Sequence, residues 1–167
     1  IHILNKTEKR LIGKATNMVM SGYCDAGVID LDINLEELLA INKIPHINKI
    51  GYVDFRSKGK NVKIKTLEND IIGKLIKTDE YFTFDDVGTG DVRYLDLLKI
   101  GFPDGLTNEV KPQLTLNGDS GALITELDET PIGILVGFGH ENKIPFSFGI
   151  KIQDIFQILQ IEKSDVL

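Results

Sequence analysis

Short segments in which apolar and polar residues alternate dominate the chain. Residues 62–65 (VKIK) and 81–84 (YFTF) alternate with a period of two, which is typical of a strand with one buried face. Residues 71–76 (IIGKLI) form an apolar run of strand length, and residues 26–31 (AGVIDL) carry a β-branched pair at their centre. These segments predict a chain built mostly from short strands.

Glycine-containing turn signals separate the predicted strands. They lie at residues 58–59 (KG), 88–91 (GTGD), 103–105 (PDG) and 117–118 (NG). Several short strands divided by such turns are typical of a β-sandwich or a β-barrel. The pattern therefore predicts an all-β fold.

Two segments have helical spacing instead. Residues 35–40 (LEELLA) are long enough for one or two turns of helix in a connection. Near the end of the chain, apolar side chains recur at the spacing of one helix face, with Gln and Asp between them. We therefore expect a C-terminal amphipathic helix that covers a core through Ile152, Ile155, Phe156 and Leu159.

Composition limits what the chain can be. Its 167 residues, 42% hydrophobic and 26% charged, suffice for one domain or two small barrels. No apolar run approaches the ~20 residues of a membrane span, so no membrane partner is expected. The net charge of −6 argues against nucleic acid as a partner, and the basic stretch 56–60 (RSKGK) is expected to be a solvated hairpin. The single cysteine, Cys24, cannot form an internal disulfide, which favours a reducing compartment such as the cytoplasm and leaves secretion open.

The main functional signal is Gly118-Asp119-Ser120-Gly121, followed by the apolar residues 122–124 (ALI). The glycine before the aspartate lets the backbone turn tightly, so that the N–H groups of Gly118 and Ser120 can point at a single oxyanion. The serine hydroxyl between them would be the attacking group. The same four residues also occur as an ordinary glycine-rich turn, so their neighbours decide the interpretation.

Other chemistries do not fit the motifs. The nucleophile elbow of α/β-hydrolases needs a glycine where Ala122 stands, and it leads into a helix where this chain has a strand-like run. The histidines and Cys24 lack metal-ligand spacing, and no phosphate loop or dinucleotide fingerprint occurs. No metal and no cofactor are therefore expected.

Three segments in order resemble trypsin-like serine proteases of the chymotrypsin fold, and in particular the compact bacterial or intracellular members without disulfides. Residues 24–29 (CDAGVI) are similar to the segment in which the triad aspartate precedes an apolar strand, and residues 118–121 match the nucleophile loop. Residues 131–139 (PIGILVGFG) resemble the strand that lines the substrate cleft, and residues 148–152 (FGIKI) lead into the last helix as in the family. The separation of the first two segments along the chain is also typical of two-barrel members.

The resemblance implies a double Greek-key β-barrel closed by a C-terminal α-helix. Two six-stranded barrels usually need more chain than is given, so we expect the first barrel to be incomplete. Residues 1–45 would then be the remainder of the N-terminal barrel with a linker, and residues 46–167 the C-terminal barrel. Association with a missing N-terminal segment is expected for the same reason.

The resemblance also implies a catalytic triad. Ser120 would be the nucleophile and Asp25 the residue that orients the base. The base would be a histidine, and the family order places it before the aspartate, which leaves His2 and excludes His46 and His140. The small residues that precede this histidine in the family are absent, so the alternative is that His2 is an incidental terminal residue.

A second interpretation of the N-terminus concerns activation. In activated zymogens of the family a new terminal amine pairs with the aspartate beside the nucleophile, which would join Ile1 to Asp119. That terminus lies well upstream of the catalytic histidine in the family, so this interpretation conflicts with His2 as the base.

The family also suggests a substrate pocket. Leu114 stands at the position that forms its bottom, and Gly137, Phe138 and Gly139 would form its walls with a register uncertain by one residue. These residues predict an apolar or medium-sized side chain before the cleaved bond. His140 could instead bind a polar side chain such as Gln, although a solvent-facing loop histidine is the simpler interpretation.

Three functional hypotheses follow. The first is a serine endopeptidase that hydrolyses polypeptide substrates through an acyl-enzyme on Ser120. The second is an inactive pseudoprotease, or a peptide- or protein-binding module with the same fold. The third is an unrelated β-rich domain in which residues 118–121 form only a turn. A fold does not fix a function, so the second hypothesis stays open beside the first.

Overall fold

The computed structural model describes most of the chain, in seven stretches. The predicted helix at residues 35–40, the predicted boundary between residues 45 and 46, Ile1 and His46 all lie outside them. The described residues are 2–4, 9–11, 13–22, 24–32, 49–86, 90–103 and 113–161.

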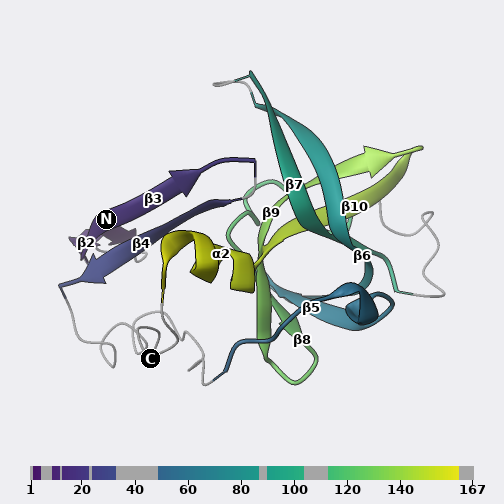
Figure 1. Ribbon diagram of the computed structural model, residues 1–167, viewed down its shortest axis with the longest axis horizontal. Coiled ribbons are helices and arrows are strands. Elements are labelled where there is room, and N and C mark those ends of the chain that lie inside the picture. Colours follow the sequence, from purple (N-terminus) through teal and green to yellow (C-terminus); the bar gives the residue numbers. More distant parts are fainter. Residues whose placement is uncertain are drawn as a thin grey trace.

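A closed six-stranded barrel forms the centre of the structure (Figure 1). Its strands follow the order β10-β7-β6-β5-β8-β9, and every neighbouring pair is antiparallel. This architecture confirms the expected all-β barrel. The strands are β5 (Asn61–Lys65), β6 (Asp70–Asp86), β7 (Gly90–Gly101), β8 (Leu123–Glu126), β9 (Pro131–Glu141) and β10 (Ile144–Lys151).

Alternation along the strands fills the barrel. In β5, Val62 and Ile64 are buried, whereas Lys63 and Lys65 are only partly covered. Side chains on one face of each strand therefore meet inside the barrel, as the period of two predicts. The buried members of this inner core are Val53, Val62, Ile64, Leu75, Leu98, Ile100, Leu114, Ile124, Ile132 and Leu135.

The hairpin of β6 and β7 is longer than the sequence pattern indicates. Residues 71–76 and 81–84, which look like two segments, belong to one strand of 17 residues. Its register against β7 shifts at three places, between Leu75 and Phe82. Within this stretch the buried positions change from odd numbers, as at Leu75, to even numbers, as at Thr78 and Glu80. As a result Leu75 lies in the inner core, while Phe82 packs on the outer side of the barrel.

A second core lies between the barrel and the strands near the N-terminus. There β3 (Gly13–Met20) and β4 (Asp25–Leu31) form a two-stranded sheet, and β1 (His2–Leu4) pairs with β2 (Lys9–Leu11) in another. Figure 1 shows helix α2 (Ile152–Leu159) beside β3 and β4 at one side of the barrel. The buried residues of this outer core are Cys24, Tyr94, Leu97, Phe148, Ile150, Ile155 and Leu159.

The C-terminal helix confirms the predicted amphipathic pattern. Ile152, Ile155 and Leu159 are buried. The helix also fixes the segment before the barrel, because the amide of Gln153 accepts a hydrogen bond from Val53 N at 2.8 Å and donates one to Val53 O at 3.1 Å. No helix in the described ranges is long and apolar enough to cross a membrane.

Candidate active site

Ser120 lies on an exposed turn just before β8, and hydrogen bonds around Asp119 fix that turn. The Asp119 carboxylate accepts a hydrogen bond from Leu116 N at 2.8 Å, and Asp119 N donates to Leu116 O at 3.2 Å. Ala122 N donates to Asp119 O at 2.9 Å. Aspartate side chains favour such turns because they can bond the nearby main chain. The serine is therefore presented to solvent on a backbone that is held on both sides.

Gly118 has a left-handed backbone conformation that favours glycine. Its φ is +98°, and a Cβ added there would meet nothing within 4 Å. Glycine is therefore favoured at position 118 because of this positive φ, and not because a side chain would lack room. In the part of the chain that the structure describes, the N–H groups of Gly118 and Ser120 donate to no protein acceptor. Two donors beside the serine hydroxyl remain available to a ligand.

Strand β9 holds the turn from the other side. Gly121 N donates to Leu135 O, and Leu135 N donates to Ala122 O, both at 2.8 Å. The hydroxyl of Ser120 donates to Val136 O at 3.1 Å. Sequence reasoning missed Val136, because contact through a backbone carbonyl leaves no mark on the identity of the residue.

The other two predicted triad residues lie in the N-terminal sheets. His2 is in β1 with its backbone paired with Leu11, and Asp25 begins β4 opposite Met20. Their side chains are outside the described part, so only their backbone positions are assigned. Cys24 belongs to the outer core, and Ala26 and Val136 both pack against it. The start of β4 therefore packs against the same cluster as Val136 on β9, whose carbonyl accepts the hydrogen bond from Ser120.

The predicted bottom of the substrate pocket is a buried part of the barrel. Leu114 is 7% exposed and belongs to the inner core. The adjacent Thr115 is fully buried, and its hydroxyl lies 2.8 Å from the hydroxyl of Ser147 on β10. Each hydroxyl therefore satisfies the other, as buried polar groups require.

The predicted pocket walls lie on β9, where two glycines make room for aromatic rings. A Cβ at Gly137 would lie 2.8 Å from Cε1 of Phe84, and one at Gly139 would lie 2.2 Å from Cζ of Phe82. One side of each glycine is thus filled by the outer core. Phe138 lies between the two glycines and is half-buried. His140, which follows Gly139, is exposed.

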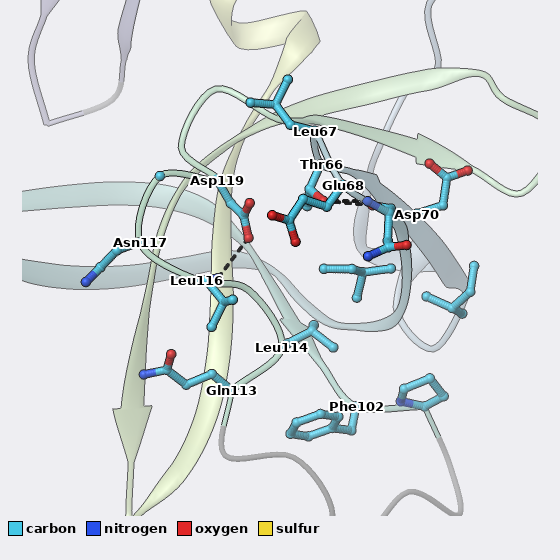
Figure 2. A pocket seen from close by; sticks show the side chains of 15 residues that line it. Thr66, Leu67, Glu68, Asp70, Phe102, Gln113, Leu114, Leu116, Asn117 and Asp119 are labelled. Atoms are coloured by element: carbon cyan, nitrogen blue, oxygen red, sulfur yellow. Dashed lines mark hydrogen bonds between the residues drawn. The ribbon is translucent and has the colours of Figure 1, made fainter.

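Two cavities adjoin the nucleophile turn on the side of the β5–β6 connection. The larger, about 780 Å³, lies between residues 66–72 and residues 113–119 (Figure 2). The smaller, about 330 Å³, is lined by residues 65–67 and 118–123 and so reaches Ser120. Sequence reasoning missed this region because residues 66–69 (TLEN) contain no motif that marks a binding site.

Ion pairs between lysines and carboxylates balance most of the charge on β5 and the turns next to it. Glu129 pairs with Lys63 and, at 2.5 Å, with Lys65. Hydrogen bonds from these two lysines hold the pKa of the Glu129 carboxyl below its usual value, although partial burial opposes the shift. Asp70 lies 3.6 Å from Lys63 and 3.9 Å from Lys65, so its charge is largely balanced. Within the described stretches no cluster of His, Cys, Asp and Glu could hold a metal ion.

Comparison with known proteins relates this arrangement to solved structures. No protein-family model matches the sequence, and a comparison with curated proteins gives no match. The MamO protease domain from Magnetospirillum magneticum is similar with a TM-score of 0.59 at 14% identity, over 95% of this chain and 74% of that one. Chymotrypsin from Cellulomonas bogoriensis gives a TM-score of 0.57 at 14% identity, over 92% of this chain and 74% of that one.

A third similar structure is a serine protease specific for glutamic acid, which uses a histidine triad in substrate binding. It gives a TM-score of 0.57 at 13% identity, over 88% of this chain and 71% of that one. The predicted fold class, a chymotrypsin-like barrel with a closing helix, is confirmed by these matches. The chain has the fold of the chymotrypsin-like serine proteases.

Proposed function

We propose that the protein is a serine endopeptidase with Ser120 as its nucleophile. The observation that carries the proposal is the turn itself. An exposed serine hydroxyl lies beside two backbone N–H groups, those of Gly118 and Ser120, that lack an acceptor among the described residues. Such donors stabilise the oxyanion of a tetrahedral intermediate, and removal of one typically costs about 10²–10³ in kcat.

Asp25 and His2 complete the proposed triad. The start of β4 packs in the same cluster as Val136, which bonds Ser120, and this supports Asp25 as the orienting carboxylate. His2 is proposed as the base because a serine hydroxyl needs a group with a pKa near neutrality to accept its proton. The glycines and Phe138 of residues 137–139 are proposed to flank the substrate, with Leu114 beneath them.

The reaction follows from these roles. His2 accepts the hydroxyl proton of Ser120 while Oγ of Ser120 forms a bond to the peptide carbonyl carbon. The carbonyl oxygen becomes an oxyanion and accepts hydrogen bonds from the N–H groups of Gly118 and Ser120. The carbon–nitrogen bond then breaks, and the imidazolium returns the proton to the leaving amine. Water, deprotonated by the same imidazole, hydrolyses the ester and restores the serine.

A second candidate is a binding module that retains the fold without catalysis. One observation favours it, because among the described residues the Ser120 hydroxyl donates to Val136 O. In that case the exposed turn and the adjoining cavities would bind a polypeptide without cleaving it.

A fluorophosphonate probe tests the two candidates. The protease hypothesis expects covalent labelling of Ser120, its loss in Ser120→Ala, and a strong reduction in His2→Ala and Asp25→Ala. Thr83→Ala is the control, since it removes an exposed hydroxyl on the β6–β7 hairpin and should leave labelling unchanged. A folded protein that the probe does not label contradicts the protease hypothesis and favours the binding module.

A further inference from the structure

The two cavities beside Ser120 share lining residues, and we call them together the groove. Both are lined by Thr66 and Leu67 on one wall and by Gly118 and Asp119 on the other. The smaller cavity reaches Ser120, and the larger extends the groove toward Phe102. A polypeptide bound at Ser120 would therefore have a channel for the residues next to its reacting bond.

Exposed apolar side chains lie on both walls of this groove. Leu67 is fully exposed, and Leu116 on the facing loop is more than half exposed. Ile72 is also exposed, and Phe102 is only half-buried. Figure 2 shows Leu67, Leu116 and Phe102 around the same space. Large apolar side chains that gather around a cavity favour an apolar ligand, because the ligand would remove their surface from water.

The described residues that line the groove give it a negative charge. Figure 2 shows the Glu68 side chain extending from the turn toward Asp119 on the opposite wall. Glu68 forms no hydrogen bond and no ion pair within the described residues, whereas Asp119 bonds only the main chain around it. Lys65 on the rim is already paired with Glu129 and Asp70. The unbalanced charge therefore comes from two carboxylates, which complement a cationic ligand.

We propose that this groove selects polypeptide substrates in which apolar and basic side chains adjoin the bond attacked by Ser120. An apolar side chain packs between Leu67 and Leu116, and a neighbouring Lys or Arg lies beside Glu68. The proposal rests on the proposed protease function, since it names the substrate class of the same site. It places a determinant of specificity on the turn at residues 66–69, which lines the same cavity as Leu114.

Binding to the Ser120→Ala variant tests the groove without cleavage. The probes are two fluorescein-labelled peptides of equal length, one alternating Leu with Arg and one alternating Leu with Glu. We expect the basic peptide to bind at least about fivefold more tightly, and Glu68→Lys to weaken it by about fivefold or more. Leu67→Ser should weaken both peptides. Asp91→Lys is the matched control, because it reverses an exposed carboxylate outside the groove, on the β6–β7 hairpin.

Each result decides the proposal. Equal binding of the two peptides overturns it, and so does an equal loss in Glu68→Lys and Asp91→Lys. The fluorophosphonate rate of Asp91→Lys, with Ser120 intact, should match that of the unmodified protein, which shows that the control substitution leaves the nucleophile unchanged. If the probe fails to label the protein but the basic peptide binds as expected, the protease function fails and the groove specificity stands.

Discussion

The ring of Phe82 lies directly against the backbone of Gly139, so that a Cβ at this glycine would lie 2.2 Å from Cζ of the ring. Phe82 also stacks on Phe148, with ring centroids 4.2 Å apart. The ring thus packs β6 against β9 and β10. Since Val136 on β9 bonds Ser120, this packing supports the strand segment that contacts the nucleophile.

Gly139→Ala should therefore destabilise the protein. The added methyl group must displace an aromatic ring in a packed core, which costs about 1–3 kcal/mol in free energy of unfolding. Urea denaturation of Gly139→Ala, Phe82→Leu and the double variant measures the coupling. The smaller side chain in Phe82→Leu should make the second substitution less costly. Strictly additive effects would contradict the contact.

A buried ion pair gives a second prediction. Lys99 and Glu80 are 4% and 5% exposed and lie 3.1 Å apart, with Lys99 also 2.5 Å from Glu141. Lys99→Met should lower the free energy of unfolding by about 3 kcal/mol. It leaves the buried carboxylate of Glu80 with the exposed Lys77 as its one ion-pair partner among the described residues, beside a hydrogen bond from Tyr81 N.

The control for Lys99→Met is the same substitution in an exposed pair. Lys49 lies 2.9 Å from Asp128, and both side chains are more than half exposed. Lys49→Met should therefore cost less than about 1 kcal/mol. Equal losses in the two variants would show that burial does not strengthen the Lys99 pair.

Local pattern was sufficient to predict some of the strands and the last helix. Residues 62–65 lie in a strand as their alternation predicts, and residues 26–31 lie in a strand as their central β-branched pair predicts. Ile152, Ile155 and Leu159 are buried as their helical spacing predicts. The continuous strand β6 could not be predicted. Its register shifts move side chains from the inner to the outer core, and such shifts depend on pairing with β7 and not on local composition.

The nucleophile turn was predictable, but its surroundings were not. The positive φ of Gly118 follows from a glycine in a tight turn. Which carbonyl of β9 meets Ser120 depends on how distant strands align, and β9 and β10 shift register near Gly149. The groove was missed because its two walls are far apart in the sequence. The roles of His2 and Asp25 remain predictions.

The ion pairs of Glu129 predict a pH dependence. Hydrogen bonds from Lys63 and Lys65 lower the pKa of its carboxyl in the folded protein. A lowered folded pKa contributes stability above the unfolded value of about 4.5, and this contribution is lost as the pH falls through the folded pKa. Glu129→Gln should therefore lower Tm at pH 7, and the difference should shrink as the pH drops below about 4.5.

Thermal unfolding across this pH range checks the Glu129 prediction. Glu68→Gln is the control, since Glu68 forms no ion pair within the described residues, and its Tm should stay close to that of the unmodified protein at pH 7. A Tm difference for Glu129→Gln that persists unchanged at pH 2 would rule out its charge as the cause.

Gly118→Ala separates the oxyanion hole from general stability. Gly118 and Gly59 have φ of +98° and +88°, and a Cβ at either would meet nothing within 4 Å. Alanine at each position should thus cost a similar 1–2 kcal/mol or so in backbone strain. Only Gly118→Ala should slow fluorophosphonate labelling, by about tenfold or more, because relief of the strain rotates an N–H group away from the oxyanion. If Gly59→Ala slows labelling equally, loss of stability and not loss of the donor explains the effect.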